Sequence, residues 1–398
     1  MRRQARYLFA VTLGVGVAGA VAWGCGKKAP SGAARGQAPD DARSAAPTRK
    51  ADRAAAAGER VSVKAGSLVA GSTPGDDGRD PLLEPVLLEV ELGPFEIDRL
   101  PFPNDPTNPA RTGVTRDEAR ALCRERGARL CSELEWERAC KGDDADLYAA
   151  GNAWDPACAK EPNSCASSLG VLALGGALRE WTDSELTAPG DDKRRAVVRG
   201  APASADGVDH RCAHRGAVDG ATKGADLGFR CCKGPPNAAA IPTLKTSEAS
   251  FTKEPLELKR VQKALQAIPE LAGYAKDASF FPEDDAVKAV LSRGDGGLKP
   301  GPVVTTSPVT WNPVPTEEVV VVALRAKATS LILAFYKLPH DGLRLASSLV
   351  LKDEAGPVVL SYTSFNKKRV TWSTCWDCPG EYGAVELRDG RRIVISHF

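Results

Sequence analysis

Apolar and polar positions alternate most regularly in the C-terminal third of the chain. Apolar residues first recur at the three- and four-residue spacing of a helix, at Leu258, Val261, Leu265, Ile268 and Leu271. A second helix is predicted from Pro282 to Arg293, ended by Gly294. After Gly301 the pattern changes to β-rich runs, at Val319–Leu324, Ser330–Tyr336, Leu345–Leu351, Val358–Tyr362, Val370–Cys375, Ala384–Leu387 and Ile393–Ser396. Residues 255–398 are therefore predicted to form an α+β domain of unknown family, a helix pair packed on an antiparallel sheet.

Two further short helices are predicted near the middle of the chain. Thr115-Arg-Asp-Glu118 and Ser132-Glu-Leu-Glu135 are capping boxes, in which the hydroxyl and the carboxylate each satisfy a free backbone N–H. The spacing places Cys123 on the apolar face of the first helix and Cys140 on that of the second. Both cysteines are expected to point into the core of one domain.

The N-terminus has the pattern of an export signal. Arg2, Arg3 and Arg6 precede an uncharged run from Tyr7 to Gly24, and Cys25 follows. Gly24-Cys25 resembles a bacterial lipobox, whose cysteine becomes lipidated, so residues 1–25 are interpreted as a signal peptide. The alternative is an uncleaved anchor, because 18 apolar residues just span a bilayer. Both interpretations place the protein outside the cytoplasm, in the periplasm or cell envelope and attached to a membrane.

Residues 26–60 are predicted to be a disordered tether. From residue 29 onward this stretch is composed mainly of Ala, Pro, Gly, Arg, Asp and Ser and holds no aromatic residue. Such a segment buries too little apolar surface to offset the entropy lost on ordering. A second linker is expected at 235–254, which is polar and contains proline.

Composition narrows the possible functions. The 398 residues include 38 Gly and 29 Pro, which indicates a loop-rich protein and argues against a helical bundle. The chain has 53 basic and 51 acidic residues, so bulk charge gives no support for nucleic-acid binding. Only four His are present, which nearly excludes a His-rich metal site.

Cysteine is the informative residue. There are 11, and Cys25 accounts for the odd one. In an oxidising compartment the remaining ten are expected to form disulfides, although the eight between Cys123 and Cys232 allow 105 pairings. Cys375-Trp-Asp-Cys378 could be a redox pair, as in thioredoxin-like folds, but it follows a strand and lacks a βαβ context. A structural disulfide closing a turn is preferred there.

Six blocks of residues occur in a family-specific order between residues 61 and 234. They are Val61–Ser72, Pro94–Asp98, Arg129–Cys140, Glu180–Thr182, Val198–Gly200 and Leu227–Cys231. Together they resemble the formylglycine-generating (sulfatase-modifying factor) enzyme family. The residues carrying the resemblance are Arg129, Leu130, Glu135, Trp136, Glu137, Glu180, Trp181, Arg199, Gly200, Gly228, Phe229 and Arg230. The resemblance implies a compact, loop-rich α+β domain related to the C-type lectin architecture.

The resemblance also implies disulfide pairings. Family members pair the cysteines that correspond to Cys123–Cys231 and Cys140–Cys212. We pair Cys131 with Cys232 because each is close in sequence to one of these bridges. Cys158 and Cys165 then close a small loop, and Cys375–Cys378 is the fifth pair.

The residues expected to carry the family's chemistry are missing. Catalytic members oxidise a substrate cysteine and bind Cu(I) with two thiolates, whose places are taken here by Pro202 and Gly207. The family's calcium-binding loop corresponds to Gly170–Ala177, with Ala173 and Ala177 where Asp and Asn supply oxygen ligands. No catalytic residue, copper site or calcium site is therefore predicted, and no other cofactor.

Two other groups of residues could provide a replacement site. His210-x-Cys212-x-His214 would place three metal ligands on one face of a strand, but a disulfide cysteine flanked by two His is preferred. Asp183, Glu185, Asp191 and Asp192 could include an acid–base pair, but a solvated surface loop is preferred.

Three functional hypotheses follow. The first is an exported, lipid-anchored pseudoenzyme in which the domain is a non-catalytic binding or scaffold module for an envelope protein or ligand. The second is a divergent enzyme of the formylglycine-generating or non-haem-iron type with a relocated active site. The third is a structural envelope lipoprotein in which both domains only hold partners.

Overall fold

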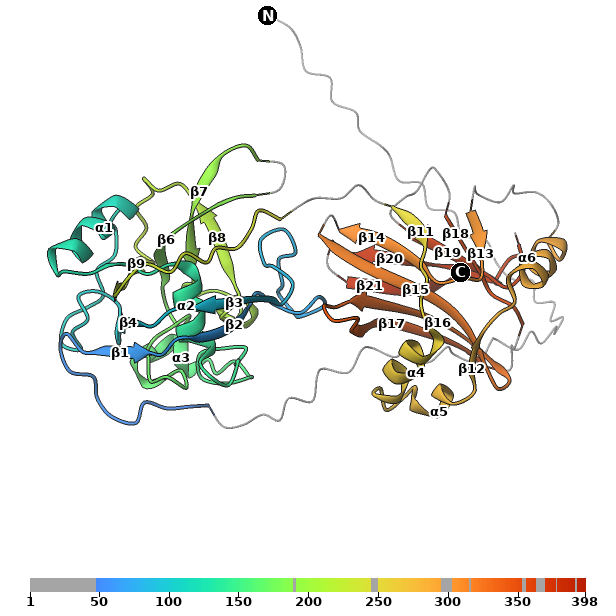
Figure 1. Ribbon diagram of the computed structural model, residues 1–398, viewed down its shortest axis with the longest axis horizontal. Helices are drawn as coiled ribbons and strands as arrows, with labels where there is room; N and C mark the ends of the chain where they lie inside the picture. The colour runs from blue at the N-terminus through green and yellow to red at the C-terminus, as the bar shows by residue number, and fades with distance from the viewer. Residues whose placement is uncertain are drawn as a thin grey trace, which may run out of the picture. The chain divides into compact units, whose positions relative to one another are not determined.

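The computed structural model describes residues 48–188, 191–244, 250–294, 303–314, 316–352, 356–362, 369–376, 378–390 and 392–398 (Figure 1). The signal segment, Cys25 and most of the expected tether lie outside these residues. Helices and strands occur in two regions, residues 48–244 and 250–398. Buried apolar residues form clusters within each region, and no described cluster combines both.

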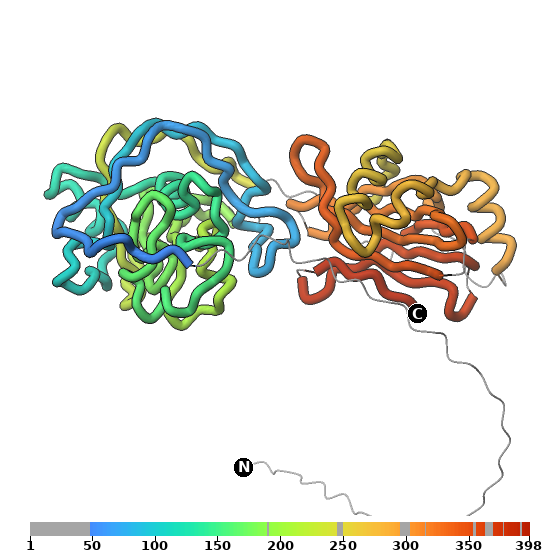
Figure 2. The backbone as a smooth tube through the Cα atoms, turned by 90° about the horizontal axis from the view of Figure 1, so that it is seen from below, coloured from blue at the N-terminus to red at the C-terminus, as the bar shows by residue number. Residues whose placement is uncertain are grey.

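The N-terminal region consists of short strands and helices joined by long loops (Figure 2). One four-stranded sheet has the order β1 (Arg60–Val63), β4 (Phe95–Asp98), β10 (Cys231–Lys233) and β5 (Arg129–Leu130). A second has the order β8 (Arg215–Val218), β7 (Arg194–Arg199), β6 (Arg179–Thr187) and β9 (Leu227–Phe229). The remaining elements are the paired strands β2 (Gly66–Ala70) and β3 (Leu88–Leu92), the helices α1 (Arg116–Glu125), α2 (Glu133–Lys141) and α3 (Ala157–Lys160), and the 3₁₀ helices η1 (Pro162–Ser164) and η2 (Gly207–His210).

Both predicted capping boxes begin helices. The Thr115 hydroxyl accepts the N–H of Glu118 at 3.2 Å, and the Glu118 carboxylate accepts the N–H of Thr115 at 2.7 Å. Ser132 and Glu135 make the same reciprocal bonds at 3.2 and 2.8 Å. In each helix the capping box satisfies one N–H of the first turn, and a distant residue accepts another: Gly220 O accepts the N–H of Arg116, and the Ser184 hydroxyl accepts that of Glu133.

The folded region begins before the boundary that composition indicates. Residues 49–59, here called the N-terminal strap, were expected in the tether but lie against the domain. Arg49 donates its backbone N–H to Ala150 O at 2.8 Å and its guanidinium to Asp146 at 3.0 Å. Arg99, which is buried, donates to Asp52 at 3.0 Å. Hydrogen bonds and ion pairs to the domain thus hold a segment that has few large apolar side chains.

The C-terminal region is a sandwich of two antiparallel sheets, rather than a single sheet covered by helices. The larger sheet has the order β11 (Phe251–Lys253), β14 (Val309–Val314), β15 (Glu317–Ala326), β16 (Thr329–Lys337) and β17 (Leu343–Lys352), with β12 (Ala278–Phe280) also on β15. The smaller has the order β13 (Val303–Thr305), β18 (Val359–Tyr362), β19 (Arg369–Ser373), β20 (Tyr382–Arg388) and β21 (Arg392–His397). Val321 and Ile332 of the first sheet share a buried cluster with Val370 and Val385 of the second. The two inner faces therefore form one core.

The helices of this region have separate positions. The helix α4 (Leu258–Gln266), with α5 (Ala272–Ala275), packs on the outer face of the larger sheet through Val261 and Leu265. The predicted second helix is α6 (Glu283–Ser292), whose Ala286 joins the cluster between the sheets.

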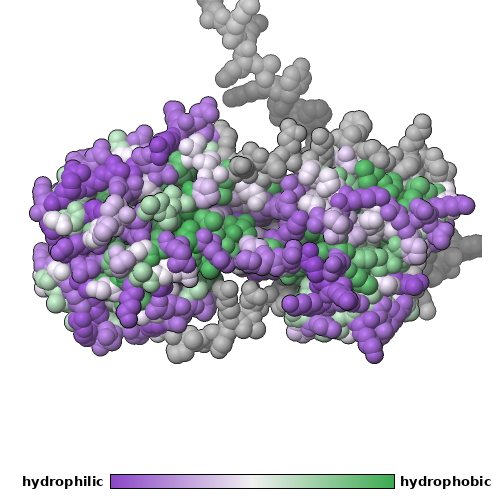
Figure 3. Space-filling view, viewed as in Figure 1, coloured by the Kyte–Doolittle hydropathy of each residue, from purple (hydrophilic) through white to green (hydrophobic). Residues whose placement is uncertain are grey.

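Within the described ranges, no helix is both long and apolar enough to cross a membrane. Figure 3 shows polar side chains over much of the visible face of each region, with apolar ones in patches between them.

Candidate functional site

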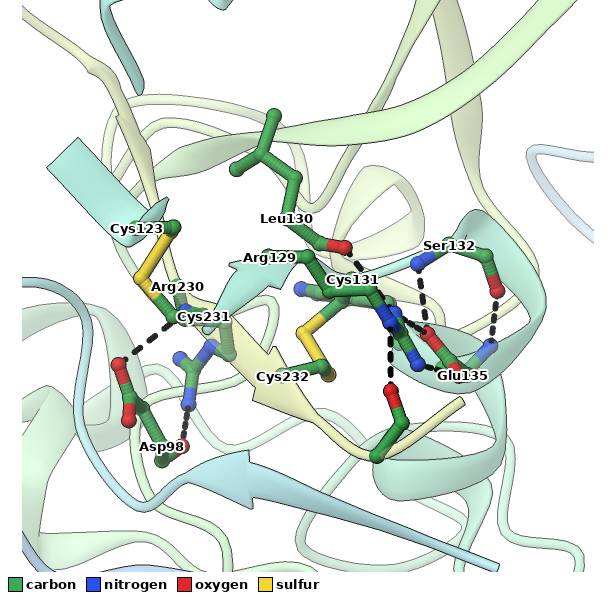
Figure 4. Close-up of a disulfide and its surroundings, with 12 residues drawn as sticks. Asp98, Cys123, Arg129, Leu130, Cys131, Ser132, Glu135, Arg230, Cys231 and Cys232 are labelled. Atoms are coloured by element: carbon green, nitrogen blue, oxygen red, sulfur yellow. Dashed lines mark hydrogen bonds and ion pairs between the residues drawn. A yellow bond between two sulfur atoms is a disulfide. The ribbon is translucent and has the colours of Figure 1, made fainter. Parts of the chain in front are cut away.

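Two adjacent cysteines on β10 form disulfides to α1 and to the residue just before Ser132, which caps α2 (Figure 4). Cys231 bonds Cys123 of α1, with Cα atoms 5.5 Å apart. Cys232 bonds Cys131, just before α2, with Cα atoms 4.9 Å apart. Neighbouring strand residues point to opposite faces, so these bridges enter two different buried clusters.

The other three disulfides are Cys140–Cys212, Cys158–Cys165 and Cys375–Cys378. All five pairs are those expected from the sequence. Cys375 follows β19 in an antiparallel sheet, and its sulfur lies 3.3 Å from the carbonyl oxygen of Arg293 just beyond α6. The pair therefore lies beside the C-terminal end of α6.

The residues of the family motifs bind one another in the interior. Glu180 accepts two bonds from the Arg230 guanidinium, at 2.6 and 2.8 Å, and one from the Trp136 indole N–H at 3.1 Å. All three side chains are at most 1% exposed. Trp181, next to Glu180, donates its indole N–H to Val114 O at 3.0 Å. Blocks that are separated by tens of residues thus meet in one hydrogen-bonded core.

A second buried network includes carboxylates from α2 and the arginine of β7. Arg199 donates to Glu133 at 3.0 Å and to Glu137 at 2.8 Å. Lys141 pairs with Glu137 at 2.8 Å, and Arg215 donates to Glu133 at 2.7 Å. Burial alone would raise the pKa of Glu137, but Lys141 and Arg199 hold that pKa below its usual value. Sequence analysis missed Glu133, although it lies on the same face of the helix as Glu137.

The remaining motif residues also serve the fold. Arg129 forms a two-bond pair with Glu135, at 2.8 and 2.7 Å. Gly200 has φ +79°, and a Cβ there would lie 2.6 Å from the carbonyl oxygen of Leu178. Leu130 and Phe229 are in the core, and Gly228 is part of β9. All of the motif residues except Arg129 are buried.

The positions of the family's copper-binding cysteines lie between β7 and Cys212. Pro202 accepts the N–H of Ala205 in a turn, and Gly207 begins η2. A Cβ at Gly207 would lie 2.7 Å from Cδ1 of Trp154. The Trp154 ring stacks on the buried His210 ring, with centroids 3.8 Å apart and planes 7° from parallel. An aromatic pair thus occupies the space in front of Gly207.

Protein donors occupy the carbonyl groups of the loop that resembles the calcium site. Arg99 donates to Gly170 O at 3.1 Å, and Arg230 donates to Leu172 O at 3.2 Å. The His210 Nδ1 lies 2.6 Å from Gly175 O. Two guanidinium groups on this loop would repel a cation. Ala173 has φ +60° and supplies no side-chain oxygen.

His210, Cys212 and His214 do not form a three-ligand face. His210 ends the 3₁₀ helix η2 instead of lying on a strand, and the Cys212 sulfur is bonded to Cys140. The His214 Nδ1 is buried and has no hydrogen-bond partner among the residues that the structure describes, and burial lowers the pKa of this imidazole. In the part of the chain that the structure describes, no group of three or more His, Cys, Asp or Glu could hold a metal.

Three of the four acidic residues after Trp181 are paired with arginines. Asp183 accepts from Arg120 at 2.6 Å, and Glu185 accepts from Arg116 at 2.9 Å. Asp191 accepts from Arg195 at 3.0 Å, and Asp192 is exposed. Arg116 holds the pKa of Glu185 below its usual value, so this carboxylate stays ionised at neutral pH. Asp183, Glu185 and Asp191 are thus each held by a guanidinium group.

Fold and motif network together define a disulfide-braced, loop-rich α+β domain. Residues 94–168 and 159–235 match the family model of the sulfatase-modifying factor enzyme 1-like domain. The chain contains a domain of this family. No curated protein gives a significant sequence match.

Similar solved structures include PvdO from Pseudomonas aeruginosa, with 17% identity, a TM-score of 0.36, and coverage of 44% of this chain and 93% of that chain. CarF has 16% identity, a TM-score of 0.34, and coverage of 44% and 97%. The variable protein 1 of Treponema denticola has 16% identity, a TM-score of 0.35, and coverage of 44% and 95%.

Proposed function

We propose that this protein is an exported, lipid-anchored envelope protein whose sulfatase-modifying-factor-like domain is a non-catalytic binding or scaffold module. One observation carries the proposal: the two positions expected to hold the copper thiolates are Pro202 and Gly207, and Trp154 fills the space beside Gly207. Neither residue has a side-chain donor for Cu(I).

The disulfides support the exported location. Five described cysteine pairs are bonded, and such bonds persist in oxidising compartments. Attachment through Cys25 would leave the domain at the membrane surface. A Cys25→Ala variant is expected to lose the lipid-modified N-terminal peptide in mass spectrometry and to leave the membrane fraction.

Copper binding and oxidation test the non-catalytic proposal. The full-length protein is titrated with Cu(I) and then supplied with oxygen and a cysteine-containing peptide. We expect no stoichiometric high-affinity copper site and no oxidation of the peptide above a no-protein blank.

A triple variant with Pro202→Cys, Gly207→Cys and Trp154→Ala serves as the matched comparison, because it restores both thiols and the space beside residue 207. It is expected to bind Cu(I) more tightly than the wild type. Copper-dependent turnover by the wild-type protein would contradict the proposal and favour a relocated active site.

A further inference from the structure

A pocket of about 430 Å³ lies between the N-terminal strap and the rest of the domain. Its volume is in the range of sites for small molecules. Leu100 and Leu172 line it and are 3% and 1% exposed, while Ala54 and Ala55 of the strap form a wall. It shares no lining residue with the stretch from Pro202 to Cys212. The body of any ligand here would contact mainly apolar side chains.

The polar part of the pocket is acidic and unpaired. Glu161 and Asn163 line it, both are exposed to solvent, and neither side chain has a hydrogen-bond or ion-pair partner among the described residues. The cations of the adjoining strap are already paired: Lys50 lies 3.2 Å from Asp155, and Arg53 pairs with Glu59. The Glu161 carboxylate is therefore free to pair with a charge from outside.

The walls of the pocket are preformed. Residues 161–164 lie inside the loop closed by the Cys158–Cys165 disulfide, and η1 begins with Pro162. The strap is held by Arg99, which donates to Asp52 at 3.0 Å and to Glu59 at 3.1 Å. The guanidinium groups of Arg53 and Arg99 hold the pKa of Glu59 at about 2, so that the ion pairs of this carboxylate persist at all physiological pH values. A ligand would therefore cost little ordering of the protein.

From these observations we infer that the pocket binds a small organic amine with a compact apolar body. The ammonium group pairs with Glu161 and hydrogen-bonds Asn163, and the apolar body lies against Leu100, Leu172 and Ala55. This binding does not depend on whether the domain oxidises thiols, so it stands apart from the proposed function.

Three probes of equal shape and different charge test the inference. Cyclohexylmethylamine, cyclohexylmethanol and cyclohexanecarboxylate are titrated into the full-length protein at pH 7, and binding is followed by ligand-observed NMR. The amine is expected to saturate the protein, with at least fivefold weaker binding of the alcohol and none of the carboxylate. Absence of saturation by the amine, or equal binding of all three, would overturn the inference.

Variants locate the binding. Glu161→Gln is expected to weaken amine binding up to about fivefold, because it removes the charge of an exposed carboxylate and keeps the shape. Ala55→Leu should weaken binding of the amine and of the alcohol by filling the pocket, while Glu125→Gln, at an exposed carboxylate on α1, serves as the control. Equal affinities of the wild type and Glu161→Gln would show that the amine binds elsewhere and would overturn the inference.

Discussion

At the scale of single residues, the buried ion pairs explain why the family motifs consist of Glu, Arg and Trp. Glu180 of β6, Trp136 of α2 and Arg230, which lies between β9 and β10, hydrogen-bond one another. A buried charge that loses its partner is costly, because its desolvation is no longer compensated. These residues are therefore required for the fold even in a domain that lacks the family's copper-binding cysteines.

Replacing Glu180 tests this role. Glu180→Ala leaves the Arg230 guanidinium, which is 1% exposed, and the Trp136 N–H without their carboxylate. We expect the free energy of unfolding to fall by about 3–5 kcal/mol. Urea denaturation measures it, with Glu125→Ala on the exposed face of α1 as the control, expected within about 0.5 kcal/mol of the wild type. A small effect of Glu180→Ala would contradict the structural role.

The ionisation of the buried Glu84 carboxylate is expected to make the free energy of unfolding depend on pH. Burial alone would raise its pKa, but Arg211, at 2.8 and 2.9 Å, and Ser72 lower the pKa to about 2. Because the folded pKa lies below the unfolded value near 4.5, the carboxylate contributes on the order of 3 kcal/mol of stability above pH 4.5. This contribution is lost as the pH falls from 4.5 toward 2.

A Glu84→Gln variant checks the prediction. Its free energy of unfolding should be lower than that of the wild type at pH 7 and should change less between pH 5 and pH 2. Glu91→Gln, on the exposed side of β3, is the control. Its free energy of unfolding should fall between pH 5 and pH 2 by the same amount as that of the wild type. Parallel pH profiles for Glu84→Gln and the wild type would rule out Glu84 as the source.

At the scale of elements, local sequence signals and the final structure agree where an element completes its own contacts. The capping boxes of α1 and α2 need only residues three positions apart. The seven predicted C-terminal strands all occur, as β15 to β21. The short strands β11 to β13 were missed, as was β14, because their three to six residues carry little periodicity before they pair.

Ser132→Ala measures the contribution of one cap. The variant loses the side-chain acceptor for the Glu135 N–H, and about 1 kcal/mol of stability is expected to be lost. Ser67→Ala, an exposed serine on β2, provides the comparison. If both variants unfold at the same urea concentration as the wild type, the Ser132 cap makes no measurable contribution to the free energy of unfolding, and the prediction is wrong.

At the scale of the whole molecule, the disulfides compensate for the small amount of regular structure in the N-terminal domain. The Cys123–Cys231 bond closes a separation of 108 residues, whereas Cys158–Cys165 closes one of 7. A longer closed loop removes more entropy from the unfolded chain.

The two bonds should therefore contribute different amounts of stability. Replacing Cys123 and Cys231 together by Ser is expected to cost about 4–5 kcal/mol, and replacing Cys158 and Cys165 about 2–3 kcal/mol. Denaturant unfolding of the two double variants measures the difference. A larger loss for the shorter loop would show that local packing outweighs chain entropy.

The sequence by itself determined the family of the domain, the two capped helices and the absence of donors at Pro202 and Gly207. These properties depend on residue identity and on short spacings. Tertiary structure alone decided three other features: the docking of the strap, the division of the C-terminal strands into two sheets, and the stacking of Trp154 on His210 in front of Gly207. Each depends on contacts between residues distant in the chain, and side-chain patterns specify burial without specifying the partner.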